Sequence, residues 1–327
     1  MNVFYVGGYS SHLNICGYYP DGTVKILDSV EIVNATYLCF SPDRKYLYAV
    51  IERENGGVAS FKAEGSGYLR YINEVSAEGA HPCHLSVNEN GDVLYVANYS
   101  SGSTVVFDLS PKGIGAVKKI IDHKDLGTAS LAVPNRQEMP HAHFVQSIKD
   151  EFWVCDLGLD VVFLFDNQNR ELCRYQMPPG FGPRHMAFHQ ELSRAYVVGE
   201  LSCEVKAIPE GEPFSLNVSS STCAAIRVSP CGKYLLASNR ANNSEGSVSI
   251  IGLDQSGSIC GPETIVASGG ICPRDFAFNP LGNKIFVANQ ESDSIDIFDW
   301  LDGSMEHCGS FEIQKPACIL FNNETTL

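Results

Sequence analysis

Three features of the sequence predict an all-β fold. Short apolar runs rich in Val, Ile, Phe and Tyr alternate with turn signals, as in LYVANYSSGSTVVFDL at 94–109. A paired unit recurs along the chain: a polar or Pro-containing lead into one strand, a turn, and then a strongly apolar strand. No helical periodicity continues for more than two turns.

The apolar strands recur seven times, at spacings of 40 to 58 residues, which is longer than the ~34 residues of a helical repeat and fits four short strands per unit. They read FYVGGY (4–9), LYAVIE (47–52), LYVANY (94–99), FWVCDL (152–157), AYVVGE (195–200), LLASNR (235–240) and IFVANQ (285–290). The strand before each also recurs, as in HPCHLSVN, GPRHMAFH and CPRDFAFNP, and turns such as NENGD and SPCGK join the two.

The two ends of the chain predict how these repeats close. The segment KPACILFNN (315–323) repeats the first-strand pattern, but no apolar partner strand follows it. The N-terminus begins with the missing partner, VFYVGGY. We therefore expect one domain over 1–327, a seven-bladed β-propeller of four-stranded antiparallel blades. Its closing blade pairs the C-terminal inner strand with N-terminal outer strands and is shared between 1–33 and 305–327.

Composition and charge exclude several classes of function. The chain has 327 residues, 44% hydrophobic and 19% charged, and no apolar run approaches the length of a membrane span. Its first residues lack the basic start and apolar stretch of a signal peptide, so we expect a cytoplasmic protein. The net charge of −15 argues against nucleic acid or an anionic membrane as partner. A small anionic ligand is still possible, because a few arginines at the binding site can outweigh more distant acidic residues.

The twelve cysteines include no CxxC pair, and several fall within or beside apolar strands. Free cysteine there behaves as a small hydrophobic residue. We therefore expect neither a structural zinc site nor a disulfide framework.

In a propeller, the starts of the inner strands and the ends of the second strands lie on one face of the disc. Polar residues at those positions are candidates for a site: His84, His141, His143, Arg184, His185, Arg274 and Asp275 from the starts, and Glu52, Asn98, Tyr99, Asp156, Glu200, Asn239 and Arg240 from the ends. Several histidines and three arginines at one mouth repel one another unless an anion or carboxylates compensate them. Six of these residues are expected to contact substrate: His84, Asn98, Tyr99, His141, His185 and Arg274.

Simpler roles compete with these assignments. Turn capping is favoured for Asn98 and for its counterparts Asp156, Asn239 and Asn289 in other blades. A hydrogen-bonded structural role is an equal alternative for His84. The spacing of His141 and His143 would allow a metal, but the local arginine excess opposes a cation, so we expect no metal and no cofactor.

The segment from Asp122 to Glu138 is the longest departure from the repeat. It leads into VPNRQEMPHAH and accounts for the 58-residue spacing. A long connection that ends at a His-rich strand start is more often functional than idle.

These repeats resemble those of the seven-bladed propeller lactonases, namely the cycloisomerase-2 type of 6-phosphogluconolactonase and carboxymuconate lactonizing enzyme. The matching segments include HPCHLSVNENGDVLYVANYSSGSTVVFDL, NRQEMPHAHFV, GPRHMAFH, VVGEL, SPCGKYLLASNR and CPRDFAFNPLGNKIFVANQ. They run from about Ala35 to Trp300.

The resemblance implies a catalytic set of His143, Arg184, Glu200 and Arg240. It implies hydrolysis of a sugar lactone, 6-phospho-D-glucono-1,5-lactone to 6-phosphogluconate, in the pentose phosphate pathway. Glu200 or His143 would activate water, Arg184 would stabilise the oxyanion, and Arg240 with Arg274 would hold the anionic group. Two alternatives stay open: a carboxymuconate-type cycloisomerase and a non-catalytic propeller that binds a sugar phosphate.

Overall fold

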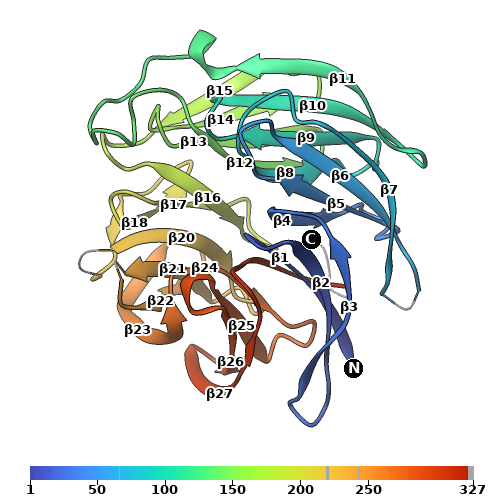
Figure 1. The fold of residues 1–327 in the computed structure, drawn as a ribbon. Coiled ribbons are helices and arrows are strands. Elements are labelled where there is room, and N and C mark those ends of the chain that lie inside the picture. The colour runs from blue at the N-terminus through green and yellow to red at the C-terminus, as the bar shows by residue number, and fades with distance from the viewer. Residues whose placement is uncertain (66, 219–220, 242, 323–327) are drawn as a thin grey trace. The chain divides into compact units, whose positions relative to one another are not determined.

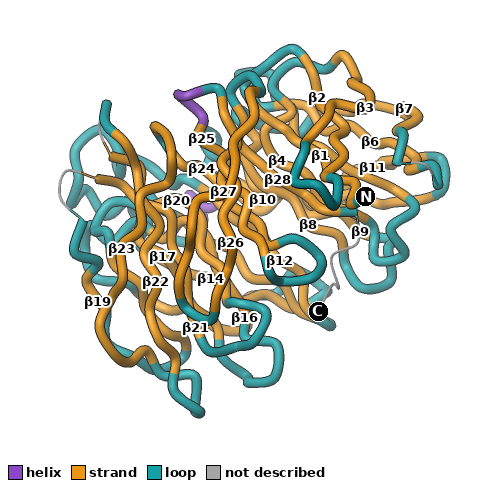
Figure 2. The backbone as a smooth tube through the Cα atoms, turned by 90° about the horizontal axis from the view of Figure 1, so that it is seen from below, coloured by secondary structure: helices purple, strands orange, loops and turns teal. Residues whose placement is uncertain are grey.

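A computed structural model describes residues 1–65, 67–218, 221–241 and 243–322. Strands make up most of these residues, as Figure 2 shows. The helices described are two 3-10 turns, η1 (His123–Asp125) and η2 (Gln290–Ser292), and no described helix is long and apolar enough to cross a membrane. The predicted all-β class is confirmed.

The strands form seven antiparallel sheets of four, the blades of a seven-bladed β-propeller, and their order can be followed in Figure 1. The predicted architecture is therefore confirmed. The chain divides into two compact units, and each is described by itself.

One unit comprises Tyr9–Ile15 and Asp28–Pro183 and contains three complete sheets. The first has β4 (Ala35–Phe40), β5 (Tyr46–Ile51), β6 (Gly57–Ala63) and β7 (Leu69–Ser76). The second has β8 (Pro82–Val87), β9 (Val93–Asn98), β10 (Ser103–Ser110) and β11 (Gly113–Asp122). The third has β12 (Ala142–Ile148), β13 (Glu151–Asp156), β14 (Val161–Asp166) and β15 (Glu171–Gln176).

The other unit comprises Met1–Gly8, Cys16–Leu27 and Arg184–Leu327. One sheet has β16 (Pro183–Phe188), β17 (Ala195–Gly199), β18 (Glu204–Ile208) and β19 (Phe214–Ser215). The next has β20 (Ser221–Val228), β21 (Tyr234–Ala241), β22 (Glu245–Leu253) and β23 (Ile259–Ile271). The last has β24 (Pro273–Phe278), β25 (Lys284–Asn289), β26 (Ser294–Leu301) and β27 (Ser304–Glu312).

The seventh sheet joins the two ends of the chain in the order β28 (Pro316–Phe321), β1 (Asn2–Gly8), β2 (His12–Tyr18) and β3 (Val24–Glu31). Strand β1 pairs antiparallel with β28, with Phe4 opposite Phe321 and Val6 opposite Ile319. The predicted closure is confirmed. One boundary needs correction, because residues 305–312 belong to β27 of the preceding sheet, so the C-terminal share of the closing blade begins at Pro316. Residues 323–327, also expected in this blade, lie outside the described residues.

Packing explains which strands are easiest to recognise in the sequence. Second strands such as β9 and β25 are buried at almost every position, whereas the outermost strand β15 alternates between exposed and half-buried residues. Aromatic rings fill the core, as where Phe152 lies 4.4 Å from Tyr95 and 5.0 Å from Phe165. Each such ring contributes roughly 1.5–3 kcal/mol by burial, so the second and third strands that carry these rings are held firmly.

Candidate active site

Arg184 and Glu200 form a buried ion pair. Arg184 is the second residue of β16, and Glu200 directly follows the neighbouring strand β17. The Arg184 Nε atom lies 2.8 Å from Glu200 Oε2, and the two side chains are 3% and 4% exposed. The prediction that these two positions meet at one sheet edge is confirmed.

Arg240, at the end of β21, supplies a second guanidinium to the same carboxylate. Its Nη2 atom lies 3.1 Å from Glu200 Oε2 and donates a 3.0 Å hydrogen bond to the Cys223 carbonyl oxygen. Arg184 Nη1 donates to the next carbonyl oxygen, that of Ala224, at 2.9 Å. Strand β20 thus fixes both guanidiniums through adjacent backbone groups. We call Arg184, Glu200 and Arg240 the arginine–glutamate cluster.

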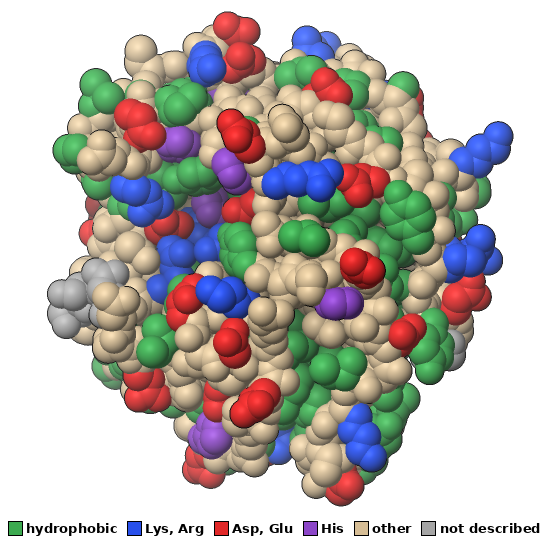
Figure 3. Space-filling view, viewed as in Figure 1, with side chains coloured by type: hydrophobic (Ala, Val, Ile, Leu, Met, Phe, Trp, Pro, Cys, Tyr) green, Lys and Arg blue, Asp and Glu red, His purple; other side chains and the backbone are tan. Residues whose placement is uncertain are grey.

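The arginine–glutamate cluster is positively charged in a protein that is strongly acidic. Two guanidiniums share one carboxylate, so these three side chains sum to +1, against −15 for the whole chain. Figure 3 shows acidic side chains spread over the visible face with basic ones gathered at a few places. A buried excess charge is costly unless an anion compensates it. The cluster therefore suits an anion, or an oxygen on which negative charge develops.

Two thiols border the cluster. Cys203 and Cys223 are 7% and 0% exposed. The hydrogen bond from Cys223 lowers the pKa of the Cys203 thiol, and the positive charge of Arg240 acts in the same direction. The same bond, together with burial, raises the pKa of Cys223 well above its usual value. The positive charge of Arg240 therefore influences the pKa values of the two neighbouring thiols.

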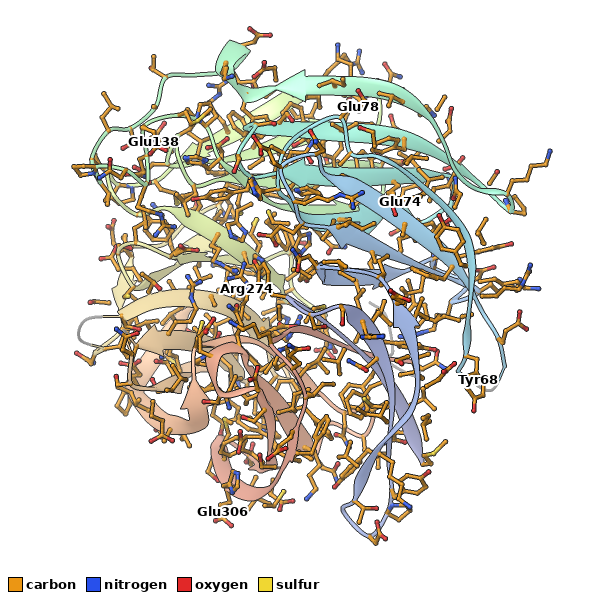
Figure 4. The ribbon with its side chains drawn as sticks, viewed as in Figure 1. Tyr68, Glu74, Glu78, Glu138, Arg274 and Glu306 are labelled. Atoms are coloured by element: carbon orange, nitrogen blue, oxygen red, sulfur yellow. The ribbon has the colours of Figure 1, made fainter. Side chains whose placement is uncertain are left out.

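Two further candidates lie at inner-strand starts in this unit. His185 follows Arg184 on β16 and is 7% exposed. Arg274 is the second residue of β24, where Figure 4 labels it, and is half-buried. Its neighbour Asp275 accepts a hydrogen bond from the Ile319 backbone N–H at 3.0 Å and pairs with Arg227 at 2.8 Å. Asp275 therefore braces three inner strands.

In the other unit, His141 is held at four points just before β12. Its backbone N–H donates to Asp156 Oδ1 at 2.9 Å, and its ring Nδ1 lies 3.1 Å from the Tyr99 carbonyl oxygen. The ring stacks on that of Tyr99 at 4.4 Å with an interplanar angle of 14°. Its Nε2 atom lies 3.5 Å from Glu138 Oε1. These contacts fix both the position and the orientation of the ring.

His143, two residues later, is 6% exposed. Its ring meets that of Tyr99 edge-on at 5.4 Å, and its Nδ1 lies 3.9 Å from Cys83 Sγ. Among the residues that the structure describes, no group of three or more His, Cys, Asp or Glu side chains is arranged to hold a metal ion.

Two predicted substrate contacts in this unit are deeply buried. His84 is 1% exposed, lies between the rings of Tyr37 at 4.0 Å and Phe144 at 4.4 Å, and accepts a 3.4 Å hydrogen bond from a backbone N–H. Asn98 is 0% exposed and donates to the Ala77 carbonyl oxygen at 3.0 Å. Both environments favour the structural alternatives left open by the sequence.

Glu52 occupies, in its own blade, the place that Glu200 has in another. Its two carboxylate oxygens accept hydrogen bonds from the Tyr9 hydroxyl at 2.8 Å and the Thr36 hydroxyl at 2.7 Å. Neutral donors therefore satisfy Glu52, whereas Glu200 binds two cations. Of these two carboxylates, only Glu200 is part of the arginine–glutamate cluster.

Comparison with known proteins shows which family the chain belongs to. The family model for lactonases with a seven-bladed β-propeller matches residues 4–321. The chain belongs to this lactonase family. It is 34% identical to a 6-phosphogluconolactonase of Formosa agariphila over 85% of this chain and 84% of the relative. It is 29% identical to a 6-phosphogluconolactonase of Bacillus subtilis over 83% and 81%.

A solved structure supports the same family. The periplasmic gluconolactonase of Pseudomonas aeruginosa superposes with a TM-score of 0.88 at 28% identity, over 98% of each chain. The chain is thus a lactonase that shares its whole blade arrangement with a gluconolactonase.

Sequence reasoning missed one buried ionisable pair of this lactonase. His123 Nδ1 lies 2.6 Å from Asp156 Oδ2, and both side chains are 0% exposed. The His123 Nε2 atom lies 3.0 Å from the Thr104 hydroxyl. His123 sits in η1, outside the repeat register, so no comparison between blades could find it. The only signal was the length of the Asp122–Glu138 connection.

Proposed function

We propose that this lactonase hydrolyses 6-phosphogluconolactone to 6-phosphogluconate. The names of its relatives support the substrate. The observation that carries the proposal is the arginine–glutamate cluster, in which one carboxylate bridges two buried guanidiniums. Ester hydrolysis needs such a positive site, because negative charge collects on the carbonyl oxygen in the transition state.

In this proposal the two arginines of the cluster have different roles. Arg184, with a side chain 3% exposed, lies in the drier position and stabilises the oxyanion. Arg240, with a side chain 14% exposed, is more accessible and contacts the anionic substrate. Arg274 assists it in holding the phosphate, since a guanidinium matches phosphate oxygens with two parallel hydrogen bonds.

Glu200 acts as the charge partner of the arginines rather than as the base. Both guanidiniums converge on its Oε2 atom, at 2.8 and 3.1 Å. Taking a proton there would weaken both ion pairs while two cations remain buried. Of the two candidates for the base, Glu200 and His143, these ion pairs disfavour Glu200.

The reaction then balances as follows. A general base takes a proton from water as the water oxygen bonds to the lactone carbonyl carbon, and Arg184 stabilises the oxyanion. The carbonyl re-forms while the bond from carbon to the ring oxygen breaks, and the ring oxygen leaves with the electron pair and takes up a proton. The ring-opened product carries both a carboxylic acid, which ionises, and a free hydroxyl group.

A lactone hydrolysis assay at slightly acid pH, where spontaneous opening is slow, tests this proposal. We expect turnover of 6-phosphogluconolactone above background and no conversion of carboxymuconate. Conversion of carboxymuconate alone would identify a cycloisomerase. Tight binding of 6-phosphogluconate without any turnover would identify a binding protein, and either result would overturn the proposal.

A further inference from the structure

Two thiols lie beside the arginine–glutamate cluster, within the same unit. Cys203 directly precedes β18, and Cys223 is the third residue of β20. Neither forms a disulfide in the structure, and both belong to one hydrophobic core. The mechanism above gives neither of them a role.

The two thiols are in direct contact. Cys223 offers hydrogen bonds to the Cys203 sulfur from both its thiol and its backbone N–H. The Cys203 thiol donates to the Ser221 carbonyl oxygen at 3.2 Å, two residues before Cys223 on the same strand. The Cys223 backbone N–H also donates to the Glu200 carbonyl oxygen at 3.1 Å. The turn from Glu200 to Cys203 is therefore fastened to the start of β20 at both of its ends.

The backbone of Cys203 adopts an unusual conformation in this turn. Its φ angle is +54°, in the left-handed region that residues other than Gly, Asn and Asp seldom adopt. The Leu216 backbone N–H holds the Cys203 carbonyl oxygen at 3.0 Å. Residues persist in such conformations where their surroundings fix them, and they cluster at functional sites. The Cys203 thiol is thus held toward β20 from both sides of its backbone.

The two thiols differ in the way that a reactive pair requires. Hydrogen bonds from Cys223 and the positive charge of Arg240 lower the pKa of Cys203, against the opposing effects of burial and of Glu200. Cys203 is also the more exposed of the two, at 7% against 0%. The thiolate is the form that attacks an oxidant, so Cys203 is the nucleophile and Cys223 the partner behind it.

Cys223 carries two backbone contacts to the arginine–glutamate cluster. Its carbonyl oxygen accepts from Arg240 Nη2 at 3.0 Å, and its N–H donates to the Glu200 carbonyl oxygen. A disulfide bond of about 2.05 Å is shorter than any hydrogen bond between the thiols, so its formation must draw Cys203 and Cys223 together. That movement acts on Arg240 and Glu200 through the backbone of Cys223.

We propose that Cys203 and Cys223 form a peroxide-sensitive thiol pair, which closes to a disulfide and thereby weakens anion binding at the arginine–glutamate cluster. The Cys203 thiolate attacks one oxygen of hydrogen peroxide, the O–O bond breaks, and the departing hydroxide takes up the proton that Cys203 lost, which leaves a sulfenic acid. The Cys223 sulfur gives up its proton, attacks the Cys203 sulfur and displaces hydroxide, which takes up that proton. The two thiols lose two electrons, and the peroxide is reduced to two molecules of water.

The first step prepares the second. In the reduced pair, the hydrogen bond to Cys203, burial, and the negative charge on Cys203 together raise the pKa of Cys223. The sulfenic acid at Cys203 is uncharged, so the opposing charge is removed once the peroxide has reacted. Cys223 then ionises more readily and attacks its oxidised neighbour.

The test treats the reduced protein with hydrogen peroxide and maps its disulfides by mass spectrometry. We expect a disulfide between Cys203 and Cys223 that dithiothreitol reverses. Cys223→Ser should accumulate a sulfenic acid at Cys203 that dimedone traps, whereas Cys203→Ser should give none at Cys223. Cys260→Ser, which removes an exposed thiol of the same unit, is the matched control and should form the disulfide as wild type does.

The effect on the cluster is read from the dependence of Tm on the concentration of inorganic phosphate, which gives a Kd without any turnover. We expect this Kd to rise about tenfold in oxidised wild type, the effect of weakening one charged hydrogen bond, and to stay unchanged in peroxide-treated Cys203→Ser. The lack of a Cys203–Cys223 disulfide under peroxide, or a phosphate response that its formation does not alter, would overturn the inference. Neither readout uses lactone hydrolysis, so a wild-type protein without turnover would refute the proposed function alone.

Discussion

Replacing Glu200 by Gln removes one charge from the arginine–glutamate cluster and almost no volume. The amide keeps an oxygen that can accept from one guanidinium, but it no longer compensates either positive charge. The local charge rises from +1 to +2 at a site where the Arg184 and Glu200 side chains are 3% and 4% exposed. Stability, turnover and anion affinity should therefore all change.

The size of the stability change follows from burial. At an effective dielectric constant of about 20, two charges about 4 Å apart interact by about 4 kcal/mol. Removing one partner of a buried pair typically costs about 3–5 kcal/mol, because the other charge stays buried without compensation. Arg240 is more exposed than Arg184, so water screens its share. We expect Glu200→Gln to lower the free energy of unfolding by about 3–5 kcal/mol, most of it through Arg184.

Thermal unfolding with and without inorganic phosphate measures this prediction. Glu200→Gln should have a lower Tm than wild type, and phosphate should restore more of it than it adds to wild type, because the variant site holds one more positive charge. Its kcat should fall about a hundredfold, since the arginines lose their alignment. Glu212→Gln, at an exposed position of the same unit, is the control. Unchanged Tm and kcat in Glu200→Gln would refute the role given to Glu200.

Three further predictions concern charges around the same fold. Arg274→Ala should raise KM for the phosphorylated lactone about tenfold, the effect of losing one charged hydrogen bond, and equal KM values would exclude a phosphate contact. Asp275→Asn should lower the free energy of unfolding in urea by at most about 3 kcal/mol while kcat stays unchanged, because Arg227 is 35% exposed and partly screened. The backbone N–H of Arg170 lowers the pKa of Asp166, so its folded value lies below its unfolded value. The stabilisation is present above the unfolded value of about 3.9 and is lost as pH falls through the folded value. The Tm deficit of Asp166→Asn at neutral pH should therefore shrink as pH falls below about 3.9, and a constant deficit would contradict the prediction.

The fold was largely predictable because its signals are local and repeated. Buried second strands and their turns recur in every blade, and a missing partner at each end implied the pairing of β1 with β28. The outermost strands were harder to place. Strand β27 is exposed at most positions, so its residues carried no apolar signal to assign them to β26 rather than to the closing blade.

The candidate site was predictable where it depends on strand ends. Arg184 and Glu200 meet because a hairpin brings the start of one strand beside the end of the next. The sequence could not tell how deeply a side chain is packed. His84 occupies a typical site position, but the ring of Tyr37, 47 residues earlier, covers it at 4.0 Å.

His123 illustrates the opposite failure. It lies in a connection without a counterpart in other blades, and its partner Asp156 looked like an ordinary turn cap. Asp156 does cap the turn through Leu159, and it binds His123 and His141 as well. Comparing the repeats identifies residues that the blades share, whereas this network depends on a connection that the other blades lack.

The central claim is that the arginine–glutamate cluster stabilises the charge that develops in lactone hydrolysis. The most direct measurement is the turnover of 6-phosphogluconolactone at slightly acid pH by wild type and Arg184→Ala in parallel. We predict wild-type turnover well above spontaneous opening and a kcat lowered about a hundredfold or more in Arg184→Ala, the usual effect of losing one oxyanion donor. Wild-type kcat in Arg184→Ala would contradict the account.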